Sequence, residues 1–233
     1  MPITSKPYKV IFGTKRWEPM NTRTSFTYAF DAYCGWCYGF SPALREFAAQ
    51  NADRIDLKVL SGGLFSGPRA QPIEAYPHIP GANERIAELT GVAFGDDYQR
   101  VLEDGTRVMD STDAATGLVA LRKQAPDREL ELASALQSAW YMDGADLSDV
   151  ETYRTIATDL GLDADATEAA YRDPASREEA EREFRELRAL GIDSYPTLLL
   201  HSDQGVHRFG GPTTSAAVLT QALDQYLAAI GKA

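Results

Sequence analysis

Cysteine is scarce in this sequence: 233 residues contain only two, Cys34 and Cys37. Small secreted domains that rely on disulfides for stability contain many more, so the chain does not belong to that class. Because only two residues separate the pair, any cysteine chemistry in this protein must be concentrated at one point.

Long apolar runs are also absent. No stretch approaches the ~20 consecutive apolar residues that a membrane helix requires, and the first thirty residues lack the apolar core of a signal peptide. Charged residues and prolines such as Lys9, Arg16 and Pro19 interrupt them. We therefore expect a cytoplasmic protein that does not bind membranes. A periplasmic location would require a leader removed ahead of this sequence.

Positive charge is in short supply. Lys and Arg total 23 against 34 Asp and Glu, which gives a net charge of -11. An acidic chain repels the phosphates of nucleic acids and anionic lipids, so neither is an expected partner. The hydrophobic fraction of 44% is sufficient for a real core.

The pattern along the chain predicts an α/β protein. Residues 25–30 are rich in aromatics and Thr and read as a strand, and residues 55–60 alternate as a second strand. Between them, Ala43, Leu44, Phe47 and Ala48 have helical spacing. This is a βαβ unit with both cysteines at the junction of strand and helix.

Helical patterns then dominate up to residue 189, and strand signals return at 197–201 and 206–209, where a short turn indicates an antiparallel hairpin. A last amphipathic helix follows. The first and last parts are expected to form one α/β layer structure that holds an all-helical insertion. The predicted divisions are an N-terminal extension, 1–24, of which 1–19 is peripheral, an α/β domain, 25–81 and 173–233, and the insertion, 82–172.

The position of the cysteines predicts redox chemistry. The unpaired N–H groups and the positive dipole at a helix start stabilise a thiolate, which is the nucleophile of disulfide exchange. We expect Cys34 to be this nucleophile, and Cys37, one turn further on and more shielded, to resolve the mixed disulfide. Gly35 would keep the approach to Cys34 open, and Trp36 would offer an apolar face to an unfolded chain.

The pair has two other interpretations. Two cysteines can simply share a core, but their place at a helix start within βαβ argues against this. A structural zinc site needs four ligands, and His78, His201 and His207 are distant in sequence. We therefore expect no metal.

A proline at the head of a buried strand is the second notable feature. Pro196 precedes the apolar run 198–200, a place from which proline is normally excluded. A cis Tyr195–Pro196 bond would explain it. The residues alone favour an ordinary trans proline at a strand start, and the CxxC pair within βαβ favours the cis form. By resemblance to thioredoxin-like folds, in which a cis-proline loop lies against the first cysteine, we expect this loop, including Thr197, to lie against Cys34 and to pair with an extended substrate segment.

Three segments resemble the DsbA-like thioredoxin family, and most closely a bacterial branch of predicted protein-disulfide isomerases. They are DAYCGWCYGF at 31–40, LSGGL at 60–64 and SYPT at 194–197. The resemblance implies a thioredoxin-like fold with an inserted all-helical subdomain, Cys34 as attacking thiol, Cys37 as resolving thiol and Pro196 as the cis-proline. It implies a thiol–disulfide oxidoreductase or isomerase that acts on protein or peptide disulfides.

In such an enzyme the redox group is the Cys34–Cys37 disulfide itself, with no bound cofactor, and glutathione is a candidate redox partner. DsbA has Pro-His between its cysteines, whereas Gly35-Trp36 supplies no such donor. A weaker oxidant, nearer the isomerase or reductase end, is therefore expected. The buried acid of many thioredoxin relatives has no clear counterpart: Asp31 is close, but we expect it to be solvated or to cap the helix.

Two other functions remain open at this stage. One is a glutathione transferase or isomerase of the kappa type, in which a serine commonly replaces the attacking cysteine. The other is a non-catalytic peptide-binding module that uses Trp36 and the proline loop. The presence of both Cys34 and Cys37 argues against the first, and loss of either cysteine would leave the second unaffected.

Overall fold

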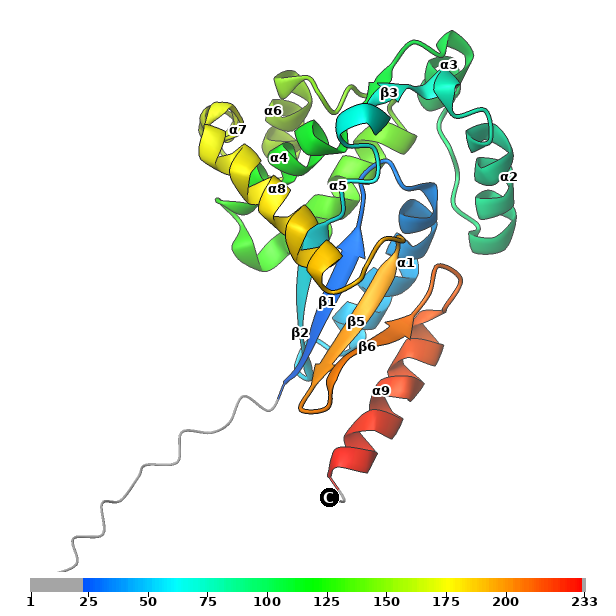
Figure 1. The fold of residues 1–233 in the computed structure, drawn as a ribbon, viewed down its shortest axis with the longest axis vertical. Coiled ribbons are helices and arrows are strands. Elements are labelled where there is room, and N and C mark those ends of the chain that lie inside the picture. The colour runs from blue at the N-terminus through cyan, green and yellow to red at the C-terminus, as the bar shows by residue number, and fades with distance from the viewer. Residues whose placement is uncertain (1–22, 232–233) are drawn as a thin grey trace, which may run out of the picture.

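The computed structural model describes residues 23–231 (Figure 1). The predictions for residues 1–19, and for most of the extension 1–24, therefore lie outside the described residues.

A four-stranded mixed sheet forms the centre, in the order β2-β1-β5-β6. The first strand, β1 (Thr24–Phe30), pairs in parallel with β2 (Ile55–Ser61) and antiparallel with β5 (Thr197–Ser202). The fourth strand, β6 (Gly205–Gly210), is antiparallel to β5. The expected strands and the C-terminal hairpin are thus confirmed.

Helices cover both faces of this sheet, which explains why β1 is apolar almost throughout. On one face, Phe26 and Tyr28 meet rings of α1 (Gly35–Gln50), and α9 (Ala216–Ile230) packs beside α1. On the other face, Ala29 lies in a buried cluster with Leu187 of α8 (Pro174–Ala189). The cysteine-bearing helix is therefore anchored by aromatic packing on the sheet.

A helical insertion separates β2 from β5, as predicted. Its helices are α2 (Ile79–Thr90), α3 (Asp96–Asp104), α4 (Ser111–Arg122), α5 (Glu129–Tyr141), α6 (Val150–Asp159) and α7 (Ala164–Arg172), with short 3-10 turns at Gly67–Arg69, Ile73–Ala75 and Pro126–Arg128. One element is not helical: β4 (Val108–Met109) pairs with β3 (Gln71–Pro72) in a separate two-stranded sheet. Among the described residues, no strand of the central sheet lies within 82–172.

Side chains from the insertion and from α8 cover the outer edge of β2. The Glu183 carboxylate accepts a hydrogen bond from Ser61 N at 2.9 Å. At Val59, the backbone N–H donates a hydrogen bond to the Glu129 carboxylate at 2.5 Å, and the carbonyl accepts one from Arg122 at 3.1 Å. Arg122 also forms a buried ion pair with Glu183. These side chains pair backbone groups that the edge strand β2 would otherwise expose. The same contacts hold α4 and α8 against the sheet.

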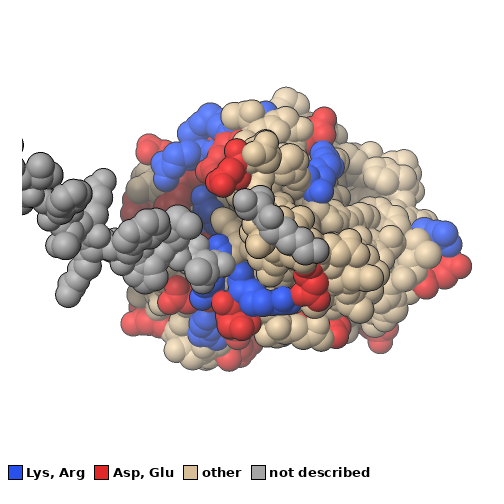
Figure 2. Space-filling view, turned by 90° about the horizontal axis from the view of Figure 1, so that it is seen from below, with Lys and Arg blue, Asp and Glu red and all other residues tan. Residues whose placement is uncertain are grey.

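The surface mixes charges of both signs. Seen from below, acidic and basic side chains alternate on the left, and the right half is largely uncharged (Figure 2). Within residues 23–231, no helix has the length and apolar character needed to cross a membrane.

Candidate functional site

The two cysteines lie where β1 gives way to α1. A turn in which Cys34 N donates to the Asp31 carbonyl at 3.1 Å leads into the helix, and Cys34 is its N-cap. Cys37 N donates both to the Cys34 carbonyl, at 2.9 Å, and to Cys34 Sγ, at 3.4 Å. The Cys34 sulfur therefore occupies the position in which a capping oxygen usually accepts a hydrogen bond from the first helical turn.

The two thiols differ in their surroundings. Both are free, Cys34 is 6% exposed, and Cys37 is completely buried. Burial raises the pKa of the Cys37 thiol well above its ordinary value, and the neighbouring Cys34 sulfur raises it further. The expected order of exposure is confirmed, and Cys37 is the thiol that holds its proton more tightly than a free cysteine.

The proline loop meets Cys34 directly. The Tyr195–Pro196 peptide bond is cis, as predicted. The Cys34 thiol donates to the Tyr195 carbonyl oxygen, with 3.4 Å between sulfur and oxygen. A residue from the last third of the chain is thus in contact with the first cysteine.

Tyr195 also joins this loop to the glycine pair that follows β2. Its hydroxyl donates to the Gly62 carbonyl at 2.8 Å, and burial raises the pKa of Tyr195 to about 12, so the donor stays protonated. A Cβ on Gly62 would lie 2.0 Å from the Tyr195 ring, and one on Gly63 would lie 2.7 Å from the Phe184 ring. Gly63 also has a φ of 69°, so both positions of the LSGGL segment require glycine.

Asp31 corrects an expectation. Instead of being solvated, it is 2% exposed, and its carboxylate accepts from Tyr33 N at 3.0 Å and Leu64 N at 2.8 Å. The Ser111 hydroxyl at the start of α4 is a further partner. Burial raises the pKa of Asp31, against the effect of these hydrogen bonds. No local pattern predicts this burial, because Leu64 and Ser111 lie far along the chain.

The remaining predicted site residues have distinct environments. Trp36 is half-buried and lies beside Cys34 at a small cavity. Thr197 is buried, and its hydroxyl donates to the Ser194 carbonyl at 2.8 Å, inside the proline loop. Gly35 lies against α2: a Cβ there would come within 2.8 Å of Ile86 Cδ1. The substrate-binding roles of these residues stay predictions.

Two observations bear on residues that the sequence left unassigned. Tyr28, beneath α1, donates to the Cys37 carbonyl at 3.4 Å, and its burial was not anticipated. His201 pairs with Thr27 at 2.8 Å, on the sheet and away from the cysteines. In the part of the chain that the structure describes, no three His, Cys, Asp or Glu side chains gather as metal ligands would.

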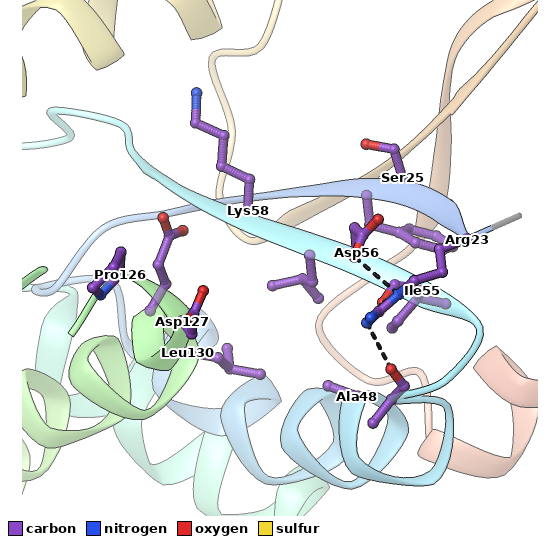
Figure 3. Close-up of a pocket in the computed structure, with 13 residues that line it drawn as sticks. Arg23, Ser25, Ala48, Ile55, Asp56, Lys58, Pro126, Asp127 and Leu130 are labelled. Atoms are coloured by element: carbon purple, nitrogen blue, oxygen red, sulfur yellow. Dashed lines mark hydrogen bonds and ion pairs between the residues drawn. The ribbon is translucent and has the colours of Figure 1, made fainter. Parts of the chain in front are cut away.

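A wider hollow of about 550 Å³ lies at the opposite end of β2, bounded by the end of α1 and the start of α5 (Figure 3). Charged side chains of β2, Asp56 and Lys58, border it, and Arg23 forms an ion pair with Asp56 at 2.9 Å. Neither cysteine lines this hollow.

Comparison with known proteins identifies the fold and a family. The model of the DSBA-like thioredoxin domain matches residues 27–224. A putative protein disulfide isomerase from Nitrosomonas europaea superimposes with a TM-score of 0.75 at 20% identity, over 88% of this chain and 98% of that one. No curated protein matches.

Two further solved structures are of the cytosolic disulfide reductase DsbM from Pseudomonas aeruginosa. One has a TM-score of 0.69 at 26% identity, over 89% of this chain and 97% of that one. The other, with GSH, has a TM-score of 0.66 at 26% identity and covers 89% of this chain and 98% of that one.

Proposed function

This chain belongs to the DSBA-like thioredoxin domain family, and from that membership we propose that it exchanges its Cys34–Cys37 pair with the disulfides of protein or peptide substrates. The protein is a DsbA-like thiol–disulfide oxidoreductase with a CxxC pair.

One contact carries the proposal: Cys34 Sγ lies 3.4 Å from the Tyr195 carbonyl oxygen, at the start of α1. The helix start favours a negative sulfur. The proline loop beside it has backbone groups that suit an extended peptide, which would place a substrate disulfide next to that sulfur. Cys37, one turn further along and buried, is within reach of Cys34 but shielded from substrate.

The reaction then follows from these positions. The Cys34 thiolate attacks one sulfur of the substrate disulfide, and the other sulfur leaves as a thiolate that takes up a proton. Cys37 next loses its proton and attacks Cys34 Sγ, which releases the second substrate thiol. The substrate gains two electrons and two protons, and the protein is left with a Cys34–Cys37 disulfide.

We propose that reduction, and not oxidation, is the main direction. Neither residue between the cysteines has a charged side chain that could stabilise the Cys34 thiolate, because Gly35 and Trp36 occupy these positions. A less stabilised thiolate makes the disulfide form relatively more stable, so the pair is a weaker oxidant. Glutathione is the proposed reductant: two molecules would reduce the Cys34–Cys37 disulfide and leave as one glutathione disulfide. The related Pseudomonas reductase crystallised with GSH supports this choice.

Insulin reduction with glutathione tests the proposal. The wild type should accelerate reduction, and Cys34→Ser should abolish the acceleration. Refolding of scrambled ribonuclease, measured beside it, shows whether isomerase activity accompanies reduction. Equal activity of the wild type and Cys34→Ser would contradict the proposal, as would transfer of glutathione to an electrophile that persists without Cys34, which would indicate a kappa-type enzyme.

A further inference from the structure

A small cavity opens beside Cys34, beneath α2. Its volume is about 140 Å³, and its walls include Cys34, Trp36, Phe65, Ala82, Ile86 and Tyr141. We call it the α2 pocket. Among residues 23–231, no Asp, Glu, Lys or Arg lines it.

Two glycines of α1 bring α2 this close to the cysteines. A Cβ on Gly35 or on Gly39 would lie 2.8 Å from a methyl group of Ile86. Glycine at both positions, one turn apart on the same face of α1, lets α2 lie directly over the start of the active-site helix. The α2 pocket is therefore part of the way the insertion packs on α1, and not an irregularity of a loop.

The polar side chains at the α2 pocket include His78 and Tyr33, and the Tyr33 hydroxyl is buried without a hydrogen-bond partner. The Asn83 amide is buried and donates to the Tyr98 hydroxyl at 3.0 Å. Burial raises the pKa of Tyr98 to about 12, so this hydroxyl is neutral. A charged group placed in such surroundings would lose its hydration, and none of the described Asp, Glu, Lys or Arg side chains lines the pocket to pair with it. The carboxylates and ammonium group of glutathione consequently do not suit this pocket, whereas hydrocarbon does.

We propose that the α2 pocket receives an apolar side chain that neighbours the reacting cysteine of a peptide substrate. The proposal rests on the proposed function, since a mixed disulfide with Cys34 would hold the substrate at the wall of the pocket. An apolar cavity of about 150 Å³ in another protein accommodates benzene, so the volume suits Leu or Phe and is too small for Trp. A peptide is favoured over a small thiol because the proline loop on the other side of Cys34 offers backbone groups to an extended chain.

Peptide disulfides of varied sequence test this. Symmetrical disulfides of short peptides, in which cysteine is flanked on both sides by Ser, Leu, Phe or Trp, are mixed with the reduced protein, and the rate of peptide thiol release is measured. Leu and Phe peptides should react about 10-fold faster than the Ser peptide, in line with burial of one apolar side chain. The Trp peptide should lose this advantage.

Ala82→Phe, which fills the pocket, should lower the ratio of the Leu and Phe peptide rates to the Ser peptide rate to about one. Glu88→Phe is the matched control, because it adds the same ring to an exposed position of α2, and it should keep the preference. Ile86→Ala enlarges the pocket and should give the Trp peptide the rate advantage over the Ser peptide that it lacks with the wild type, which provides a second test if Ala82→Phe does not fold.

The outcomes separate this proposal from the proposed function. Equal rates for all four peptides, or a preference that survives in a folded Ala82→Phe, would overturn the pocket proposal and leave the oxidoreductase assignment intact. Absence of exchange with every peptide would overturn both.

Discussion

The Asp31 carboxylate accepts a hydrogen bond from Leu64 N at 2.8 Å, and so joins the turn before the cysteines to the glycine loop after β2. Tyr195 joins the same loop to the cis-proline turn through its hydroxyl bond to Gly62. The three loops around Cys34 are thus held together by two side chains.

Asp31 should make stability depend on pH. Burial raises its pKa in the folded protein, so the folded state binds a proton more tightly than the unfolded chain. The resulting stabilisation is complete below the ordinary value of 3.8 and is lost as pH rises through the raised folded value. Asp31→Asn has no carboxyl group at this position, so its free energy of unfolding should not show this decrease as pH rises. Urea unfolding at several pH values measures it, with the exposed Asp53→Asn as control; identical pH profiles for Asp31→Asn and wild type would contradict the assignment.

The Gly62–Tyr195 contact should appear as a coupling between the two residues. Gly62→Ala should destabilise the fold by about 1–3 kcal/mol, because the added methyl overlaps the Tyr195 ring. In a Tyr195→Ala background the same change should cost much less. Denaturant unfolding of the two single variants and the double variant gives the interaction energy, and an additive result would show that the ring does not limit position 62.

Arg122 should be important for stability because it neutralises Glu183 at the edge of β2. Both side chains are buried, and Arg122→Met leaves a carboxylate without its cation, at a cost of about 3–5 kcal/mol. Arg182→Met is the control, since Arg182 is exposed on α8 and its loss should cost little. Comparable effects of the two changes on the unfolding midpoint would argue against this role for the ion pair.

Cys37 should resist alkylation at neutral pH. In Cys34→Ser, burial still raises the pKa of the remaining thiol, since burial is the largest cause of its shift. The iodoacetamide reaction should therefore proceed only at a pH well above the range of an ordinary cysteine, and unfolding in urea should restore an ordinary profile. A Cys37 that reacts in the native variant as fast as in urea would contradict its shielding.

Local patterns predicted much of this fold. Aromatic and apolar strands such as β1, the cysteine spacing at a helix start and a proline ahead of β5 each depend on neighbours in sequence, so the strands, the hairpin and the cis Tyr195–Pro196 bond could be predicted. The two-residue strand β4 could not, because its partner β3 lies in an irregular Pro-rich connection.

The supports of the site are less visible in sequence because their partners are distant. The carboxylate of Asp31 looks like an ordinary loop residue until α4 covers it. The glycines at 62 and 63 are conspicuous in the sequence, but the rings that require them, Tyr195 and Phe184, come from β5's entry loop and from α8. Likewise, Gly35 faces Ile86 only because α2 folds back over α1.

The central claim is that Cys34 attacks and Cys37 resolves. Trapping tests it most directly: each single Cys→Ser variant is incubated with insulin, quenched with acid, and analysed by non-reducing mass spectrometry. Cys37→Ser should accumulate a covalent complex through Cys34, because the first attack proceeds and the second cannot, while Cys34→Ser should accumulate none. A complex that forms with Cys34→Ser and not with Cys37→Ser would reverse the roles and contradict the account.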